Sequence, residues 1–489
     1  MRYKTIKSLV VLFVSACIAI SCGDDFVDVD AFDENSEDFF NSEEDYQDAL
    51  VAAYDLLQST YLNVMLGEIA SDNTLAGGES ATDVPGIQEV DDMIHTPVNS
   101  QIRDIWGWMF AGVNRANYVL EFKDKTDFSG KESVIAEATF LRAYYYFELV
   151  KWFGDVPLSV DERLLFGDQN TVERTPKADV YAQIEIDLIF AAQNLPSTQT
   201  DVGRATKGAA QALLGKVYLY QDKFTEAADV LDEVIATGPY DLVTDYNAMF
   251  EFEGENNIES VFEVQYTDEE GAGFDCLQCS EGNIAVGFNG IRNYTGPFFE
   301  SGFSFNVPTQ EVVNAFEEGD IREDVAILDI ESWAAQNAGV SYVEGNEHTG
   351  YYNRKYISRV GDLNTGDANL TNPNNYRAIR FADVLLMAAE AHNRKAAPND
   401  TQAQAYLNRV RTRATLDNVT TTGTNLTTDI YNERRVELVG EGHRFFDLVR
   451  TGRAAQEIDG FTAGKNEVFP IPSIEIELAG NRWNQNTGY

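Results

Sequence analysis

The sequence predicts a mainly α-helical protein: a tetratricopeptide-type helical superstructure with loop-rich insertions and a few short strands. Three observations lead to this fold class. Helical periodicity dominates from about residue 38 to about residue 240. One stretch within that region matches a 34-residue helix-pair repeat. Between about 241 and 375 glycine, asparagine and aromatic residues become frequent and helical spacing fades, and helical patterning then returns.

The amino terminus has the layout of a lipoprotein signal peptide. A basic start precedes the apolar stretch 9–20, which is well short of the roughly 20 residues that cross a bilayer. Cys22 follows it and resembles a lipobox cysteine. Cys17 is an alternative lipidation site because the residues before it fit the lipobox consensus better. Cleavage there, however, would leave apolar residues at the start of the mature chain. We expect a signal peptide over 1–21 and a lipid at Cys22, the first residue of an acidic tether (22–37); an ordinary secreted protein is the alternative.

Helices are expected near 43–59, 101–121, 178–194 and 205–221. A further helix presents apolar residues at spacings of three and four, and Gly154 and Pro157 end it. The residues on its apolar face are Val134, Ala138, Leu141, Tyr145, Leu149 and Trp152.

The tetratricopeptide match centres on Gly215, the small residue of the first helix of the pair. Gln211 occupies the usual tryptophan position, which is a departure. The other matching positions are Leu214, Tyr218, Ala227, Leu231 and Pro239, and a weaker second match runs through Ala391, Ala403, Leu407 and Val410. Because such a pair buries its apolar face only by stacking on neighbours, we expect several more helix pairs.

These patterns divide the mature chain into three regions. Residues 38–240 form an N-terminal tetratricopeptide-containing helical region, and 376–489 form a C-terminal helical region with a tail. Between them, 241–375 is loop-rich, with strand-like runs such as 260–266. Long irregular segments are commonly functional, so we expect this middle region to bind ligand.

The composition excludes several classes of function. A formal charge of −44 repels nucleic acid and anionic lipid, and it is mainly explained by solubility in a salty medium. Cys276 and Cys279 are too few for a zinc site, so in an exported protein we expect a local disulfide. No metallopeptidase or nucleotide-binding motif is present, and we expect neither metal nor cofactor.

Distinctive segments occur at 380–391, 433–448, 469–472 and 485–489 in the C-terminal third, and at 106–117, 141–146 and 153–157 in the N-terminal half. Together they resemble the SusD/RagB family of surface glycan-binding lipoproteins. Arg482 and Thr487 stand where the family tail often has proline. The resemblance implies a right-handed helical superstructure that caps a SusC-like, TonB-dependent transporter in the outer membrane and captures oligosaccharide without catalysis.

In proteins of this family the charged residues of these segments mostly stabilise the fold. We therefore expect Arg434, Arg435, Glu437 and Arg444 to form salt bridges within the helical region.

Ligand contacts are expected on loops, where aromatic faces and planar polar groups suit a sugar ring. Asp72 and Asn73, in the loop 71–99, resemble a polar pair that some relatives use for ligand. The middle region supplies further candidates: Tyr294, Arg322, Trp333 and Tyr351, with Phe298, Phe299, Tyr342 and Tyr352 as other aromatics. For any single aromatic residue, core packing is the competing interpretation.

The sequence thus predicts a non-catalytic, lipid-anchored protein on the outer face of the outer membrane. It would bind a neutral glycan, such as laminarin or another β-glucan, or a fructan, and pass it to the transporter. A surface glycoside hydrolase is one alternative, since paired carboxylates could hide among the acidic residues. A peptide-capturing member of the same family is another.

Overall fold

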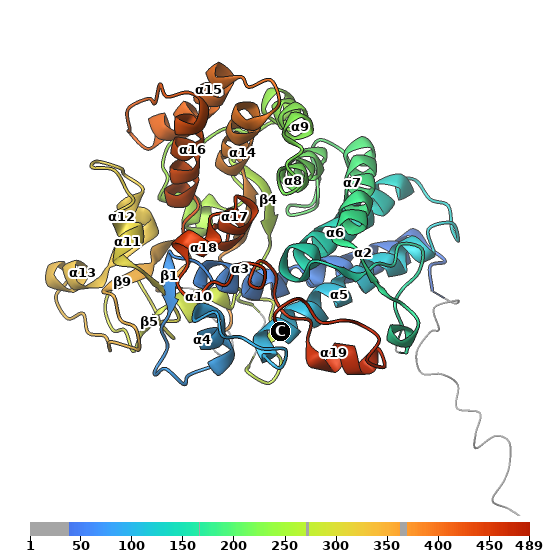
Figure 1. The fold of residues 1–489 in the computed structure, drawn as a ribbon, viewed down its shortest axis with the longest axis horizontal. Helices are drawn as coiled ribbons and strands as arrows, with labels where there is room; N and C mark the ends of the chain where they lie inside the picture. Colours follow the sequence, from blue (N-terminus) through green and yellow to red (C-terminus); the bar gives the residue numbers. More distant parts are fainter. Residues whose placement is uncertain (1–38, 166, 270–272, 362–368) are drawn as a thin grey trace, which may run out of the picture.

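The computed structural model describes residues 39–165, 167–269, 273–361 and 369–489. The fold is mainly helical, as predicted (Figure 1). The longer helices are α2 (Glu43–Asp55), α3 (Tyr61–Ile69), α4 (Pro85–Asp91), α5 (Ser100–Glu121), α6 (Lys131–Phe153), α7 (Lys177–Asn194), α8 (Lys207–Leu219), α9 (Phe224–Thr237), α14 (Phe381–Arg394), α15 (Asp400–Arg413), α16 (Gly423–Glu437) and α17 (Arg444–Arg450). The remaining helices of the described residues are α10 (Ala285–Asn289), α11 (Gln310–Val313), α12 (Glu323–Ala326), α13 (Ile330–Gln336), α18 (Ala454–Glu457) and α19 (Ser473–Leu478).

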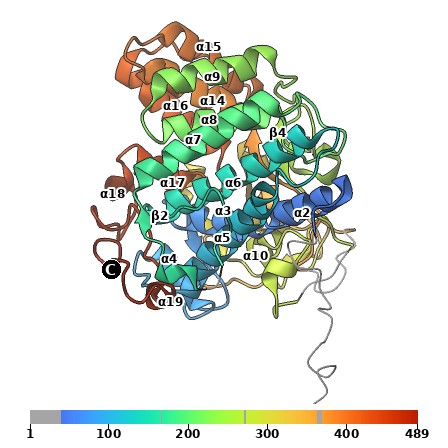
Figure 2. The same ribbon diagram turned by 90° about the vertical axis from the view of Figure 1, so that its right-hand side faces the viewer.

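Successive helices stack into one array. Figure 2 shows α5, α6, α7, α8 and α9 following one another from the lower part of the molecule to the top, where α14, α15 and α16 continue the array. Helix α6 lies inside this array, and almost every residue from Val134 to Phe153 is buried. It ends at Gly154, whose φ of 71° lies in the left-handed region, as the sequence predicted.

Helices α8 and α9 form the predicted tetratricopeptide pair. A Cβ at Gly215 would lie 2.5 Å from Cδ2 of Leu231, so only glycine allows the two helices to approach this closely. Ala227 and Leu231 are fully buried. The second match corresponds to the packed pair α14 and α15, where Ala403, Leu407 and Val410 are buried.

The strands are short and pair two by two. The antiparallel pairs are β1 (Thr74–Ala76) with β7 (Asn306–Pro308), β2 (Val156–Pro157) with β3 (Arg174–Thr175), β4 (Ser260–Val264) with β10 (Tyr376–Arg380), and β8 (Ile327–Asp329) with β9 (Tyr351–Asn353); β5 (Ile291–Arg292) and β6 (Ser301–Gly302) are parallel. The pair β1–β7 joins the N-terminal helices to the middle region, with Leu75 opposite Val307. The pair β4–β10 joins the start of the middle region to the start of α14.

Part of the middle region forms a lobe with its own packing. In Figure 1 this lobe lies on the left, where α11, α12, α13 and β9 gather. One small core in it contains Ile291, Tyr294, Phe299, Leu328, Ile330, Tyr352 and Ile357. This core packs against Trp333, Val340 and Tyr342 and is separate from the main core. The lobe therefore has a hydrophobic core of its own beside the helical array.

A buried arginine–glutamate cluster connects the lobe, strand β10 and helix α16. We define it as Arg322, Arg380, Arg413, Glu259, Glu433, Glu437 and Glu441. Arg380 Nε donates to Glu441 Oε2 at 2.8 Å, and Arg322 Nη1 donates to Glu437 Oε2 at 2.8 Å. Buried charges need such partners, since an unpaired ion loses its hydration without compensation.

The four residues that we expected to be architectural do form salt bridges. Glu437 belongs to this cluster. Arg434 pairs with Asp383 and Asp447, while Arg435 and Arg444 both pair with Asp72.

Further observations concern the chemistry of the described residues. Cys276 and Cys279 form the predicted local disulfide. In the part of the chain that the structure describes, no group of histidine, cysteine and carboxylate side chains is arranged to hold a metal ion. Within the same residues no helix combines the length and apolar character that a bilayer crossing needs. Cys22 lies outside the described residues.

Candidate functional site

Asp72 and Asn73 are held by other parts of the protein. The Asp72 carboxylate accepts two hydrogen bonds from Arg444, each of 2.7 Å, and lies 2.9 Å from Arg435. Asn73 is fully buried, donates to Glu68 and accepts from Arg435 Nε at 2.8 Å. The expectation of a ligand-binding polar pair is therefore corrected: these groups join the 71–99 loop to the C-terminal helices.

Arg322 is also excluded from the site. Its side chain is completely buried and donates to Asp320, Glu433 and Glu437. With its guanidinium so enclosed, no ligand hydroxyl can reach it, which corrects the sequence expectation. Tyr351 is half-buried on β9, where its hydroxyl donates to Gln310 Oε1 at 3.0 Å, and it does not line the cavity described next.

A large open cavity lies at one side of the lobe. Its volume is about 1090 Å³, which is the scale of a site for an extended ligand. Its walls come from the 3₁₀ turns η4 (Ala248–Phe250) and η5 (Phe252–Gly254), the loop before Phe299, helix α13 and the residues after η7 (Arg354–Tyr356). The lining residues are Asn247, Glu251, Phe252, Glu253, Asp268, Glu269, Phe298, Phe299, Trp333, Gln336, Asn337, Arg354, Arg359, Val360, Gly361 and Pro373.

Aromatic side chains dominate one wall of this cavity. Phe298 is 63% exposed, and its ring centroid lies 5.6 Å from that of Trp333, edge to face. The indole of Trp333 donates to the Tyr294 hydroxyl at 2.9 Å, and Tyr294 in turn donates to the carbonyl of Pro297. Tyr294 is buried, and burial raises the pKa of its hydroxyl. Tyr294 therefore fixes the orientation of Trp333 from behind and offers little surface to a ligand.

The backbone of Phe298 is strained. Its φ of 71° is uncommon for a residue with a large side chain, and an adjacent segment holds it through the bond from Val360 N to Phe298 O (2.9 Å). Backbone strain at an exposed aromatic residue is a feature that clusters at ligand sites. Here it directs the ring into the cavity while the next residue, Phe299, is buried in the lobe.

The polar groups of the cavity are amides, carboxylates and two arginines. Arg359 donates from Nε to Glu251 Oε2 at 3.0 Å and from Nη2 to Glu251 Oε1 at 3.1 Å. The Arg359 guanidinium also lies 5.2 Å from the ring centroid of Phe299. Burial lowers the pKa of Arg354, and the neighbouring positive charge of Arg359 lowers it further. The lining contains four carboxylates and two arginines, so its formal charge is negative. This combination suits hydroxyl groups better than anions.

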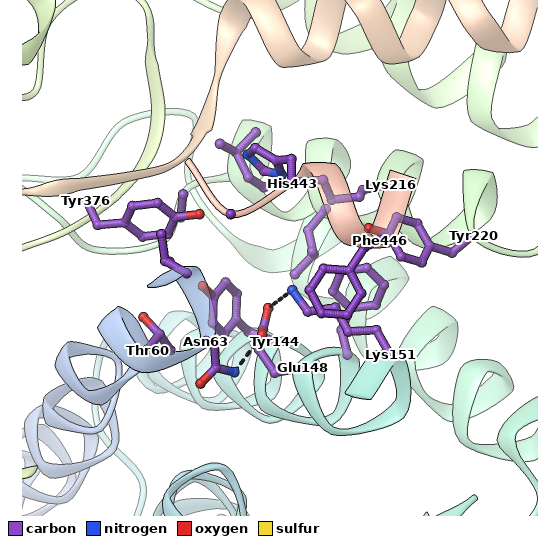
Figure 3. Close-up of a pocket in the computed structure, with 16 residues that line it drawn as sticks. Thr60, Asn63, Tyr144, Glu148, Lys151, Lys216, Tyr220, Tyr376, His443 and Phe446 are labelled. Carbon is purple, nitrogen blue, oxygen red and sulfur yellow. Dashed lines mark hydrogen bonds and ion pairs between the residues drawn. The ribbon is translucent and has the colours of Figure 1, made fainter. Parts of the chain in front are cut away.

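A second, enclosed pocket lies between α3, α6, α8 and α17 (Figure 3). Its volume of about 30 Å³ has room for one or two water molecules and not for a sugar ring. Lys151 Nζ lies 2.6 Å from Glu148 Oε1, and Asn63 donates to the other oxygen of Glu148 at 2.7 Å. It is an interior polar pocket, and the open cavity is the better candidate.

Sequence reasoning missed Phe252 and Arg359. Phe252 is 59% exposed and stands between two glutamates, and such an isolated aromatic in a charged run is a usable signal of exposure. Nothing in the local sequence marks Arg359, because its partner Glu251 lies 108 residues away.

Two family profiles match this chain. The SusD family profile matches residues 322–469, and a profile described as "Starch-binding associating with outer membrane" matches residues 25–219. Among curated proteins, SusD-like protein P2 of Formosa agariphila is 27% identical over 434 residues, covering 82% of this chain and 83% of that protein.

Solved structures of SusD-like and surface glycan-binding proteins are also similar to this chain. A laminarin-binding SusD-like protein is 38% identical with a TM-score of 0.85, covering 92% of this chain and all of that one. Surface glycan-binding protein A from Bacteroides thetaiotaomicron, in complex with laminarihexaose, is 27% identical with a TM-score of 0.81, covering 91% of this chain and 99% of that one. The 38% identity to the laminarin-binding SusD-like protein over 92% of this chain, together with the two family profiles, shows that this chain belongs to the SusD/RagB family.

Proposed function

We propose that this protein is a non-catalytic, lipid-anchored surface protein that binds a neutral glycan in the open cavity of the lobe. It passes that glycan to a SusC-like transporter. The observation that carries the proposal is the exposed Phe298–Trp333 wall beside amide and carboxylate side chains. Flat aromatic faces stack on the apolar faces of sugar rings, and planar polar groups bond their hydroxyls.

The charge of the cavity favours neutral over acidic glycans. Its four carboxylates outnumber its two arginines, and Glu251 already pairs with Arg359. A uronate or sulfate group entering it would meet like charge. A neutral β-glucan such as laminarin meets these requirements, and laminarin and laminarihexaose are the ligands named for two structural relatives. A fructan is the second neutral candidate.

The test is isothermal titration of purified protein with laminarin oligosaccharides. Phe298→Ala should weaken affinity about 5- to 30-fold, equivalent to the roughly 1–2 kcal/mol of a well-placed aromatic contact. The matched control is Phe274→Ala: Phe274 is similarly exposed, at 59%, but does not line the cavity. If both variants bound laminarin oligosaccharides with equal affinity, this would contradict the placement of the glycan in the open cavity.

Two controls address the alternatives. Release of new reducing ends that persists through repurification would indicate a glycoside hydrolase. No heat of binding with laminarin, levan or inulin, together with binding of peptides, would indicate the peptide-capturing type of protein. Alginate serves as the acidic-glycan comparison and should bind more weakly than laminarin.

A further inference from the structure

A second pocket that opens to solvent lies where the end of α2, strand β4 and the loop before α8 meet. Its volume is about 430 Å³, within the usual range for a site that takes a small organic ligand. It shares no lining residue with the cavity of the lobe. We call it the α2 pocket and define it by the lining residues Val51, Tyr54, Gln58, Val202, Glu263 and Glu281.

Apolar side chains and one tyrosine ring form part of this lining. Val51 and Val202 stand at the rim, 55% and 66% exposed. Tyr54 is half-buried, and its hydroxyl donates to Glu137 Oε2 at 2.7 Å and accepts from the Ala205 N–H at 2.9 Å. These two bonds fix the ring, so a ligand in the pocket meets its apolar surface. A fixed aromatic ring between exposed aliphatic groups suits the C–H face of a sugar.

An amide and a carboxylate in the lining have acceptor atoms to offer. Gln58 Nε2 donates to the backbone carbonyls of Gln265 and Glu281, at 3.1 and 3.4 Å, which leaves Gln58 Oε1 for a ligand. Glu281 forms no ion pair with the described residues, whereas the other carboxylates of the lining each lie beside an arginine: Asp55 beside Arg115, Asp201 beside Arg204 and Glu263 beside Arg377. Planar groups of this kind accept hydrogen bonds from sugar hydroxyls.

One buried carboxylate oxygen in the lining lacks a hydrogen-bond donor. The side chain of Glu263 is 1% exposed. Its Oε2 accepts from the backbone N–H of Asn256 at 3.0 Å and from Asn375 Nδ2 at 3.3 Å. Among the described residues, neither Glu263 Oε1 nor Arg377 Nε, which lie 3.8 Å apart, has a hydrogen-bond partner. Leaving both buried groups in this state costs free energy, which a suitable ligand group recovers.

This pair of atoms selects the chemical class of the ligand. A group beside both must donate to Glu263 Oε1 and accept from Arg377 Nε. A hydroxyl group does both, whereas an ammonium ion has no lone pair and an ionised carboxylate or sulfate has no proton to donate. The pocket is therefore suited to a neutral, hydroxyl-rich ligand.

The walls of the pocket are held in place without a ligand. A Cβ at Gly203 would lie 2.4 Å from Cγ of Gln265, and the φ of Gly203 is 90°, so glycine lets this loop approach β4 closely. The next residue, Arg204, donates from Nη1 to Gln47 of α2 at 2.9 Å. Because the loop is fixed to both neighbours, little ordering is required when a ligand enters.

The α2 pocket is close in the chain to the cavity of the lobe. Gln265 lines the pocket and Asp268 lines the cavity, and three residues of chain span at most about 11 Å. We propose that the α2 pocket is a second sugar-binding site, in which a short stretch of the same neutral glycan packs on Tyr54 and bonds to Gln58, Glu263 and Glu281. The identity of this ligand rests on the proposed function. Two sites on one protein raise the affinity for long chains above that for short ones.

The test is equilibrium dialysis of the purified protein against labelled laminaritriose at saturation. The wild type should bind two molecules, and the rim variant Val51→Asp/Val202→Asp should bind one. The matched control is Ile186→Asp/Val98→Asp, which also changes one helical and one loop residue, 61% and 77% exposed, outside both sites. It should bind two molecules. Glu281→Ala should weaken the second site roughly 5- to 10-fold, as expected for one lost hydrogen bond to a charged group.

The other outcomes separate this inference from the proposed function. Equal numbers of bound molecules in the wild type and the rim variant, with unchanged Tm, overturn the second site and leave the proposed function standing. One bound molecule that the rim variant loses and Phe298→Ala keeps supports the α2 pocket and counts against the cavity of the lobe. Stronger binding of a glucosamine trimer than of laminaritriose to Phe298→Ala overturns the assignment of the pocket to neutral sugars.

Discussion

Replacing Glu437 by glutamine should destabilise the protein more than any single change on its surface. The Glu437 side chain is fully buried on α16, and its carboxylate receives the guanidinium groups of Arg322, Arg380 and Arg413. Burial by itself would raise the pKa of this carboxyl, but the charges of the three arginines outweigh it and hold the pKa well below its usual range. Glutamine keeps the shape and removes the charge on which three buried cations depend.

The expected loss is about 3–5 kcal/mol of unfolding free energy, the range for breaking a buried ion pair by removing one partner. For a chain of 489 residues the unfolding entropy is on the order of 1 kcal/mol/K, so this loss lowers Tm by roughly 3–5 °C. The matched control is Glu317→Gln. Glu317 pairs with Arg411 at 2.6 Å, but its side chain is 58% exposed, and such a pair contributes at most about 1 kcal/mol.

The measurement is urea unfolding of both variants, followed by tryptophan fluorescence and by circular dichroism. Because the folded pKa of Glu437 is depressed, its stabilisation is present above the unfolded pKa of about 4.3 and fades as pH falls through the folded value. The difference between wild type and Glu437→Gln should therefore shrink in acid. A Glu437→Gln variant no less stable than Glu317→Gln at pH 7 would refute the reasoning.

Four smaller predictions test other parts of the fold. Gly215→Ala should cost about 1–3 kcal/mol because the new methyl meets Leu231. Gly107→Ala on α5, where nothing lies within 4 Å, should gain roughly 0.5–1 kcal/mol, and chemical denaturation compares the two. Burial, with the charge of Lys465, lowers the pKa of His95 to about 4, so stability should fall as pH drops from about 6.5 to that value, because only the unfolded chain then takes up the proton. Stability measured against pH should show a flatter profile for His95→Gln. Tyr489→Phe removes a hydroxyl that lies 2.8 Å from His95 Nε2 and accepts from Asn466, and it should lower the free energy of unfolding by about 1–2 kcal/mol in denaturant titration; an unchanged midpoint would show that the C-terminal residue is not anchored there.

Helices could be predicted from periodicity because the residues that each helix buries recur at spacings of three and four within its own sequence. The predicted helix at 101–121 appears as α5 (Ser100–Glu121), and that at 178–194 as α7 (Lys177–Asn194). Gly215 identified a helix pair because close packing requires a small residue at that position. The disulfide of Cys276 and Cys279 could also be predicted, since both partners lie within one turn of chain.

The candidate site could be predicted only in part. The aromatic content of the middle region indicated ligand contact there, and the structure brings Trp333 and Tyr294 together. Phe298 was one aromatic among several in that region, and its exposure depends on a backbone conformation that a list of residue types does not reveal.

The sequence by itself determined the helical superstructure and the tetratricopeptide pair, and it predicted the region that holds the proposed site. Only the tertiary structure decided which polar residues are enclosed by other parts of the protein and which line the open cavity. Asp72 and Arg322 have the chemistry of binding groups, but each meets its counter-charge across a long stretch of chain: Asp72 lies 372 residues from Arg444, and Arg322 lies 115 from Glu437. Whether a charged side chain binds a ligand or another part of the protein depends on what folding places beside it, because a buried charge must be paired wherever its partner originates.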